Sequence, residues 1–465
     1  MQFGDILDDF SLDVSTSSLE VTRVEIDSRE CAPGTLFFAM PGARHHGAKF
    51  AKDAVARGAV CVVSDRPIDL LAPVVVVPTT QLPALLAHAS AAIVGHPEAR
   101  AKLVAVTGTN GKTSVTTLVG SLAQALSWNA ASIGTLTNLR TTPSAPELYR
   151  TLAAMVSRFD AATPDSLVAI EVSSHALDQH RVAGLRFCVA AFTNLAHDHL
   201  DYHHTMEQYF LTKASLFTIE HAKRAVIWTD DGYGERLADM TPLPVTRVSR
   251  SDAVDVETSL RGSTFFWRGH LVNSPLVGDY NVDNALVAMA IMSTLGVSDA
   301  RVAASMGEVA SIPGRFDVLY GEGVTVIVDF AHTPEGLERL LVDVRQLQPG
   351  ARIITVFGAG GDRDRTKRSE MGRIVSTQAD LTIVTSDNPR SESPNAIIDD
   401  VMVGVASGAQ VFREPDRRQA IARALDSART GDVVVIAGKG HESTQTVGDL
   451  VLPFDDRVVV QELLK

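Results

Sequence analysis

A single stretch decides the fold of this 465-residue chain, namely Val104-Ala105-Val106-Thr107-Gly108-Thr109-Asn110-Gly111-Lys112-Thr113-Ser114. Residues 103–106 form a short apolar run, which predicts a buried strand, and the residues from Lys112 onward suit a helix. Between them lies a glycine-containing turn, whose backbone N–H groups and following helix N-terminus favour a bound phosphate. Lys112 adds a positive charge there, and the Thr113 hydroxyl suits Mg²⁺.

This loop differs from the usual nucleotide-binding pattern, which has four residues between its glycines. Here two residues separate Gly108 from Gly111. A bare Gly-Lys-Thr is often accidental, and the alternative is an ordinary turn between a strand and a helix. Because a strand pattern precedes it and a helix pattern follows it, we favour nucleotide binding. The phosphate-binding candidates are Gly108, Thr109, Asn110, Gly111, Lys112, Thr113 and Ser114.

Length, charge and cysteine content limit the class of protein. A chain of 465 residues is too long for one core, and about three domains are expected. The net charge of −13 argues against broad binding of nucleic acid or anionic membranes. The three cysteines, Cys31, Cys61 and Cys188, lack metal-site spacing and are predicted to be reduced, buried thiols. We see no signal peptide and no apolar run of membrane-spanning length, so we expect a cytoplasmic protein.

Short β-rich runs alternate with helical patterns along the chain, which predicts α/β domains with largely parallel sheets. Breaks at 95–98 and 312–315 divide the chain into predicted domains 1–97, 98–313 and 314–465. The predicted strands are 21–26, 35–40, 59–64, 74–77, 103–106, 167–170, 189–192, 225–228, 324–328, 353–357, 381–385 and 433–437. The predicted helices are 50–57, 82–94, 206–217, 335–347, 368–377, 395–405 and 417–428. The last domain reads as a Rossmann-like βαβ series, in which ligands bind at the carboxyl ends of the strands.

Polar residues follow two strands of the middle domain. Glu171 ends the strand 167–170, and His199 lies in the segment after strand 189–192. If these strands flank the phosphate-loop strand, both side chains and Thr113 suit a phosphate-bound Mg²⁺. The alternatives are a solvated carboxylate and an ordinary loop histidine. Zinc is not expected, because no cysteine or second ligand pair accompanies the cluster of His197, His199, His203 and His204.

Three loops of the last domain also carry charges, at 358–365, 386–390 and 438–442. Arg363 and Arg390 offer forks for carboxylates, and Asp387 and Glu442 offer partners for an ammonium group. Mixed charges in one cleft favour a small zwitterion over a phosphate. For each loop alone, the alternative is a solvated turn rich in Gly, Asp and Pro.

Together these residues resemble the Mur ligase family, the ATP-dependent amide-forming enzymes of peptidoglycan assembly, nearly from end to end. Residues 107–113 match its ATP loop, including the short spacing, and 171–177 and 198–201 match its magnesium segments. Lys213 alone reads as a surface lysine, but it falls where the family has a lysine carbamylated by CO₂, whose new carboxylate holds a second Mg²⁺. The resemblance implies that Lys112, Glu171, His199 and Lys213 are catalytic, and that Mg²⁺ is held by Thr113, Glu171, His199 and carbamylated Lys213.

The resemblance also implies an N-terminal uridine-nucleotide-binding domain, a central P-loop-type ATPase domain and a C-terminal amino-acid-binding domain. It implies ATP contacts from Asn281, Asn284, Arg315 and Asp329. It implies contacts to a UDP-MurNAc-dipeptide from Ser28, Arg29, Thr141, Thr142, Ser173, Gln179 and Arg181. It implies contacts to diaminopimelate from Arg363, Asp387, Asn388, Arg390, Gly438 and Glu442. Relatives that add lysine usually lack the arginine that stands here as Arg390.

The implied reaction is phosphorylation of the D-glutamyl γ-carboxylate of UDP-MurNAc-L-Ala-D-Glu by ATP, followed by attack of an amino group of meso-diaminopimelate. The alternatives are the same reaction with L-lysine or another diamino acid, or a non-catalytic nucleotide-binding partner of a cell-wall enzyme. We expect a monomer. The chain departs from the family in a shorter segment 131–141, in Phe330 for a commoner tyrosine, and in Phe316-Asp317 for a commoner Met-Glu.

Overall fold

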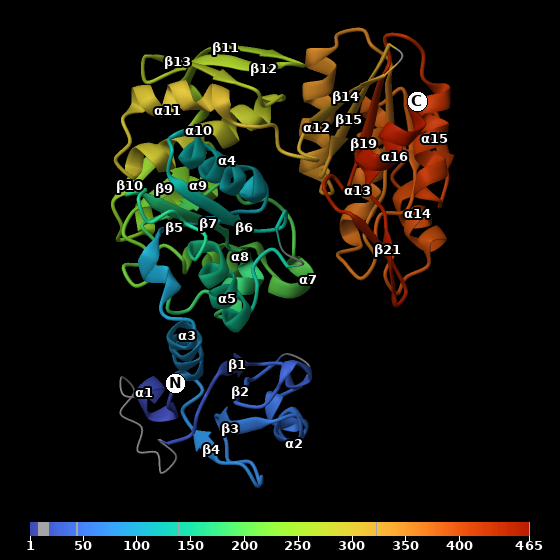
Figure 1. Ribbon diagram of the computed structural model, residues 1–465. Coiled ribbons are helices and arrows are strands. Elements are labelled where there is room, and N and C mark those ends of the chain that lie inside the picture. The colour runs from blue at the N-terminus through green and yellow to red at the C-terminus, as the bar shows by residue number, and fades with distance from the viewer. Residues whose placement is uncertain (8–17, 43–44, 138–139, 322, 465) are drawn as a thin grey trace.

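The computed structural model describes residues 1–7, 18–42, 45–137, 140–321 and 323–464. Three α/β domains follow one another along the chain, each built on its own sheet (Figure 1). The mixed α/β class and the largely parallel sheets are therefore as predicted. The exact boundaries after residues 97 and 313 stay predictions.

The N-terminal sheet is parallel, in the order β1-β2-β3-β4. Its strands are β1 (Arg23–Glu25), β2 (Thr35–Ala39), β3 (Ala59–Ser64) and β4 (Val74–Val76). Its helices are α1 (Phe3–Leu7), η2 (Ser28–Glu30), α2 (Ala51–Ala56) and α3 (Leu82–Ile93). Helix α3 joins two cores, because Leu82 and Leu85 pack with the first sheet, whereas Ala87 packs with the central domain.

The central sheet has six parallel strands in the order β10-β9-β8-β5-β7-β6. Its strands are β5 (Lys102–Thr107), β6 (Asn129–Ile133), β7 (Ser166–Glu171), β8 (Val189–Phe192), β9 (Ala225–Trp228) and β10 (Val245–Val248). The helices around it are α4 (Lys112–Ala125), α5 (Ala145–Val156), α6 (Ser174–Asp178), α7 (Leu200–His203), α8 (Met206–Ala214), α9 (Gly232–Met240), α10 (Asp279–Thr294) and α11 (Asp299–Ser305). Strand β5 lies between β7 and β8, which confirms that the Glu171 and His199 segments flank the phosphate loop.

A small antiparallel sheet of the central domain was not predicted. It consists of β11 (Ala253–Ser259), β12 (Gly262–Trp267) and β13 (His270–Ser274). Phe265, Trp267 and Val272 are buried, whereas Phe266 and Leu271 are exposed. Such one-sided strands lack the continuous apolar runs that mark strands buried on both faces, which are the runs that the prediction used.

The C-terminal sheet has the order β14-β15-β19-β16-β17-β18, with only the edge pair β14–β15 antiparallel. Its strands are β14 (Asp317–Gly321), β15 (Val324–Asp329), β16 (Ile353–Phe357), β17 (Leu381–Val384), β18 (Val411–Arg413) and β19 (Val433–Ala437). Its other elements are α12 (Pro334–Leu347), α13 (Thr366–Gln378), α14 (Pro394–Met402), α15 (Arg417–Ser427), α16 (Asp456–Leu463) and the hairpin β20 (Thr444–Val447)–β21 (Leu450–Pro453). Because β19, β16 and β17 are neighbours, their three charged loops meet at one edge, as predicted.

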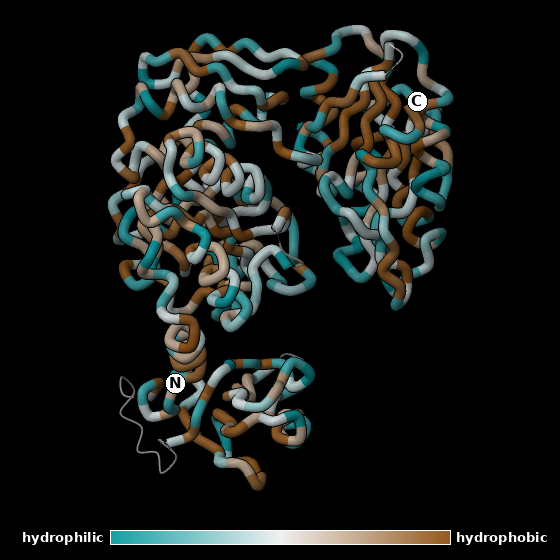
Figure 2. The backbone as a smooth tube through the Cα atoms, viewed as in Figure 1, coloured by the Kyte–Doolittle hydropathy of each residue, from teal (hydrophilic) through white to brown (hydrophobic). Residues whose placement is uncertain are grey.

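Hydrophobic residues are concentrated in the strands of the C-terminal sheet, which lie inside the domain, and α12 and α15 flank them (Figures 1 and 2). Across the part of the chain that the structure describes, no helix is long and apolar enough to cross a membrane.

A buried ion pair holds the C-terminal domain together. Arg417 and Asp456 are both fully or almost fully buried and share two hydrogen bonds of 2.7 Å. We expect Arg417→Met to destabilise the domain by about 3–5 kcal/mol, because it leaves the Asp456 carboxylate buried without its partner. The midpoint of urea unfolding, followed by circular dichroism, measures this loss.

Arg418→Met is the matched control, since Arg418 pairs with Glu462 at 2.7 Å but both side chains are about half exposed. An exposed pair contributes less than about 1 kcal/mol. Equal shifts of the two midpoints would contradict the importance of burial.

Candidate functional site

The phosphate loop needs both of its glycines. Gly108 and Gly111 have φ values of +149° and +81°. A Cβ at Gly108 would collide with the Thr193 hydroxyl, and one at Gly111 with the side-chain oxygen of Asn284. Asn194 fixes the loop, since its carbonyl accepts from Thr109 N at 2.9 Å and its Oδ1 accepts from the amide of the next residue, Asn110, at 2.9 Å. The loop then opens α4, as the sequence predicts.

Two lysines converge on this loop. Lys112 Nζ donates to the carbonyls of Gly108 and Thr109 at 3.1 and 2.7 Å. Lys213 Nζ, from α8, donates to the same Gly108 carbonyl at 2.7 Å and lies 4.6 Å from the centre of the Tyr209 ring. Lys213 is only 1% exposed, so the interpretation as a surface lysine is wrong. Burial lowers the pKa of both lysines, that of Lys213 well below its usual value.

Glu171 is a buried carboxylate beside the loop, not a solvated one. Its oxygens accept from the hydroxyls of Thr113 and Thr135 at 3.1 and 3.2 Å and from the Thr135 amide at 2.9 Å. Burial raises the pKa of Glu171, although Lys112 lies near enough to oppose that shift. In the described residues Glu171 makes no ion pair. A buried carboxylate and the Thr113 hydroxyl are the oxygen donors that Mg²⁺ prefers beside phosphates, so they fit this ion.

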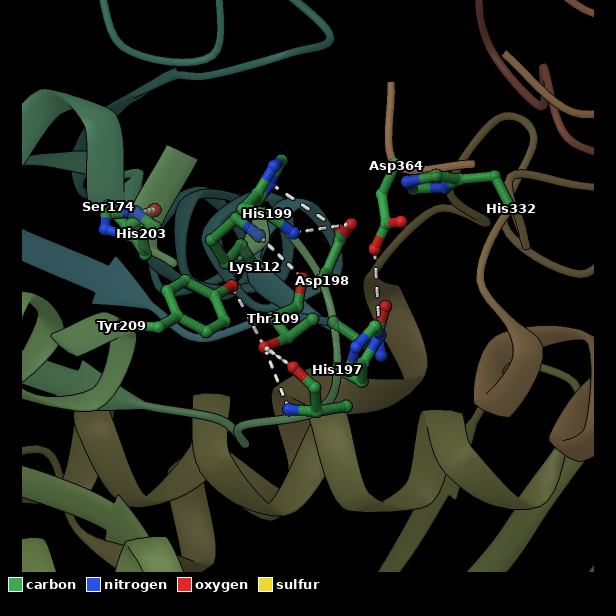
Figure 3. A network of polar contacts seen from close by, with 12 residues as sticks. Thr109, Lys112, Ser174, His197, Asp198, His199, His203, Tyr209, His332 and Asp364 are labelled. Carbon is green, nitrogen blue, oxygen red and sulfur yellow. Dashed lines mark hydrogen bonds and ion pairs between the residues drawn. The ribbon is translucent and has the colours of Figure 1, made fainter. Parts of the chain in front are cut away.

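A cluster of histidines lies next to the loop (Figure 3). Asp198 accepts from the His199 amide at 2.9 Å, and its other oxygen lies 3.6 Å from His199 Nε2. Burial lowers the pKa of His199 to about 3 and that of His203 to about 4, so both rings are neutral at physiological pH. His203 is hydrogen-bonded to Ser174 Oγ at 2.9 Å. No group of three or more His, Cys, Asp or Glu in the described segments is arranged to hold a metal ion.

The C-terminal domain reaches directly into the phosphate loop. Arg315 Nη2 donates to Thr113 Oγ1 at 3.0 Å, and its guanidinium lies 4.3 Å from the centre of the Phe330 ring. Asp329 is buried and accepts from the Phe316 amide at 2.7 Å and from the Tyr280 hydroxyl of the central domain at 2.8 Å. The predicted ATP residues of the two domains therefore meet at one junction.

The two asparagines of α10 lie on the other side of the loop. Both Asn281 and Asn284 are buried. Asn284 Nδ2 donates to Asn281 Oδ1 at 3.0 Å, and Asn281 Nδ2 donates to the Val277 carbonyl at 2.8 Å. Since Asn284 also faces Gly111, these residues lie beside the phosphate loop, where a nucleotide would extend. Ser114, the last loop candidate, is buried in the first turn of α4.

Most of the predicted dipeptide-binding residues form one linked group. Thr142 Oγ1 donates to the Glu171 carbonyl at 2.7 Å and accepts from the Ser173 amide at 3.1 Å. Arg181 donates to the Thr142 carbonyl at 2.7 Å and to Gln179 Oε1 at 2.6 Å. Thr141, next in the chain to Thr142, accepts from the Thr135 hydroxyl.

Ser28 and Arg29 are held within the N-terminal domain instead, the first by Asp53 at 3.0 Å and the second by Asp27 at 2.6 Å. Sequence reasoning missed Arg140, whose charge acts both on Asp27 of the N-terminal domain and on Arg181 of the central domain. The hydrogen bond from Arg29 lowers the pKa of Asp27 and Arg140 adds to it, while burial and Arg140 lower the pKa of Arg181. Residues 138 and 139 of the shortened segment lie outside the described residues.

The amino-acid loops form a network of hydrogen bonds. Asn388 Nδ2 donates to Asp387 Oδ1 at 2.9 Å and to Glu442 Oε2 at 2.8 Å. Lys439, which the sequence analysis missed, is fully buried and pairs with Glu442 at 3.0 Å. Gly438 has φ +115°, and a Cβ there would lie 2.8 Å from Asp387 Oδ2.

Two arginines face the same loops. Arg390 Nη1 donates to the Gly361 carbonyl at 2.7 Å, whereas Arg363 is exposed. Burial lowers the pKa of Arg390, and the charge of Arg363 adds to this shift. Neither guanidinium makes an ion pair with any residue that the structure describes. Two neighbouring cations without a carboxylate favour an anionic group of a ligand.

Comparisons with known proteins identify the family. Residues 20–110 match the family model "Mur ligase family, catalytic domain", 106–292 match "Mur ligase middle domain", and 314–440 match "Mur ligase, glutamate ligase domain". A UDP-N-acetylmuramoyl-L-alanyl-D-glutamate–2,6-diaminopimelate ligase of Gloeobacter violaceus is 42% identical, over 96% of this chain and 94% of the relative. The ligase of the same name from Aquifex aeolicus is 38% identical, over 97% and 95%.

Solved structures also match nearly the whole chain. A structure of a protein with the same ligase name is 31% identical, covers 100% of this chain and 98% of its own, and has a TM-score of 0.68. The MurF ligase of Thermotoga maritima, in complex with ADP, shares the fold with a TM-score of 0.64 at 19% identity, over 96% and 97%. By these matches along nearly its whole length, the chain belongs to the Mur ligase family.

Proposed function

We propose that this chain is an ATP-dependent ligase of peptidoglycan precursor synthesis. It joins meso-2,6-diaminopimelate to the γ-carboxylate of D-glutamate in UDP-MurNAc-L-Ala-D-Glu. The names of relatives at about 40% identity support this substrate pair. The observation that carries the proposal is the phosphate loop with its buried lysines, together with the mixed-charge loops of the C-terminal domain.

ATP binds with its phosphates on residues 108–114, where Lys112 and the backbone N–H groups balance their charge. Mg²⁺, held by Thr113 and Glu171 with His199 and Lys213 nearby, would neutralise charge on the transferring phosphoryl group. Arg315 donates to the Thr113 hydroxyl and so ties the third domain to this end of the nucleotide. Asn281, Asn284 and Asp329 position the rest of the nucleotide. The product of this step is an acyl phosphate on the D-glutamyl γ-carboxylate.

The acceptor is held by Thr141, Thr142, Ser173, Gln179 and Arg181, with Ser28 and Arg29 on the uridine side. Thr142 donates to the Glu171 carbonyl, and this contact supports an acceptor end that lies beside the phosphate loop. Asp387, Asn388, Gly438 and Glu442 hold the ammonium end of diaminopimelate, and Arg363 and Arg390 hold its distal carboxylate. The amine then attacks the acyl phosphate, which releases phosphate and forms the amide.

Lys213 is carbamylated in the active enzyme. A lysine reacts with CO₂ through its neutral amine, and burial of Lys213 lowers its pKa, which favours that form. The carbamate would add an oxygen donor beside Gly108, the residue to which Lys213 now donates. We further propose that the enzyme acts as a monomer in the cytoplasm.

The first prediction concerns turnover. Release of phosphate from ATP is expected to require both the UDP-muramoyl dipeptide and diaminopimelate. Lys112→Ala is expected to lower this rate on the order of 10²–10³-fold, because it removes a charge that stabilises the transferring phosphoryl group. Lys223→Ala, at an exposed lysine of the same domain, is the control and should leave the rate unchanged. Binding of the acceptor without any nucleotide turnover would contradict the proposal.

The second prediction concerns selectivity between amino acids. The wild type is expected to prefer diaminopimelate over lysine by about 10³-fold, since lysine leaves the two arginines without a carboxylate. Arg390→Ala is expected to remove most of that preference, measured by kcat/KM for each amino acid. Arg413→Ala, at an exposed arginine paired with Asp399, should keep it. An Arg390→Ala enzyme that still rejects lysine would contradict the assignment, and a wild type that prefers lysine would identify the alternative substrate.

The third prediction concerns the modification. Incubation with ¹³C-bicarbonate is expected to give one carbamate resonance in the NMR spectrum of the wild type and none in Lys213→Arg. Turnover of Lys213→Arg should fall by about 10²-fold or more, because a guanidinium cannot form the carbamate. Lys223→Arg should keep both the resonance and the activity. A fully active wild type without the resonance would disprove the carbamate.

A further inference from the structure

The first turn of α13 contains two adjacent basic residues that are both buried. Lys367 is 7% exposed and Arg368 is not exposed at all. Buried basic side chains are rare unless they are paired. The partners of Arg368 lie at the amino-acid loops, whereas the partner of Lys367 lies in the central domain. The two residues therefore contact opposite sides of the proposed reaction.

Arg368 holds the amino-acid loops. Its Nη2 donates to the Gly360 carbonyl at 3.1 Å and to Glu392 Oε1 at 2.7 Å, and its Nη1 donates to Asp400 at 2.9 Å. Glu392 also accepts from the backbone amide of Asp362 at 2.6 Å. Arg368 thereby clamps the loop that carries Arg363 to the segment that follows Arg390.

Lys367 reaches across the domain junction. Its Nζ lies 3.5 Å from Oδ1 of Asp198, which is 6% exposed. In the described parts of the chain, Asp198 is the only carboxylate that pairs with Lys367. The same Asp198 oxygen accepts the amide of His199 at 2.9 Å (Figure 3). Lys367 therefore supports the segment that turns beside the phosphate loop.

The charge balance shows what Lys367 contributes. Both Asp198 and Lys367 are buried, and in the described residues Lys367 is the only lysine or arginine that pairs with this carboxylate. Without Lys367, Asp198 would be a buried carboxylate with no lysine or arginine beside it, which is unfavourable.

We infer that Lys367 is a positioning residue which, together with Arg368, couples the amino-acid loops to the Asp198–His199 segment. The inference rests on the proposed function, because it takes the loops around Arg363 and Arg390 as the diaminopimelate site. Neighbouring residues in one helical turn keep a fixed separation. An amino acid that orders the loops therefore also holds Lys367 against Asp198. Binding of the amino acid and binding of the nucleotide at the phosphate loop then strengthen each other.

The test measures this coupling with three variants. Mg²⁺–ADP is titrated by calorimetry into enzyme saturated with the UDP-muramoyl dipeptide, with and without diaminopimelate, so that no turnover occurs. In the wild type we expect diaminopimelate to raise the affinity for ADP about 5-fold or more. In Lys367→Met this ratio should fall to about 1, and Lys367→Arg should restore part of it. A ratio of affinities cancels any uniform loss that a general structural defect would cause.

Arg373→Met is the matched control, because Arg373 lies on the same helix but is exposed and pairs only with Glu370 in the described chain. It should keep the wild-type ratio. A wild-type ratio of 1, or an unchanged ratio in Lys367→Met, would overturn the coupling while leaving the ligase proposal intact. A wild type that neither binds diaminopimelate nor turns over ATP in its presence would overturn both.

Discussion

Two ammonium groups share one backbone carbonyl, and the rest of the site depends on this constraint. Lys112 and Lys213 donate to the oxygen of Gly108 at 3.1 and 2.7 Å. Two buried cations so close together need either an anion or the loss of one charge. Neither lysine makes an ion pair within the described residues, and Glu171, whose charge acts on Lys112, is bound by hydroxyl and amide donors. The loop therefore suits a ligand with several negative charges and a lysine that becomes neutral.

No single domain contains this site. Arg315 bonds to Thr113, and the side chain of Asp343 on α12 accepts the first amide of α10, that of Asp279, at 2.6 Å. The helix N-terminus favours such a carboxylate. Because these contacts couple the second and third domains, the angle between the domains determines whether the phosphate loop faces the amino-acid loops. Chemistry that passes an activated acyl group to an amine needs that alignment.

The sequence predicted the parallel strands and the residues at their ends, because strands buried on both faces are apolar runs and their ends carry the polar groups. It could not find β11–β13, whose exposed faces break such runs. The local sequence alone predicted Lys213 to be a surface lysine, since nothing local distinguishes a buried lysine from an exposed one, and only the family resemblance pointed to a role for it. Lys367 was missed for a related reason, because its partner Asp198 lies far away in the chain. Burial and pairing between distant segments appear only in the folded chain.

The two arginines also explain selectivity by repulsion. Neither Arg390 nor Arg363 makes an ion pair in the described structure, and the charge of Arg363 adds to the effect of burial in lowering the pKa of Arg390. A ligand carboxylate relieves this repulsion, whereas lysine, which has a distal ammonium group but no distal carboxylate, leaves it unrelieved. At the proposed diaminopimelate site, lysine would therefore leave a repulsion that diaminopimelate relieves, and this adds to the discrimination that the attractive contacts give. Arg368 bonds to both loops through Gly360 and Glu392. It thereby keeps Arg363 and Arg390 close enough to repel each other.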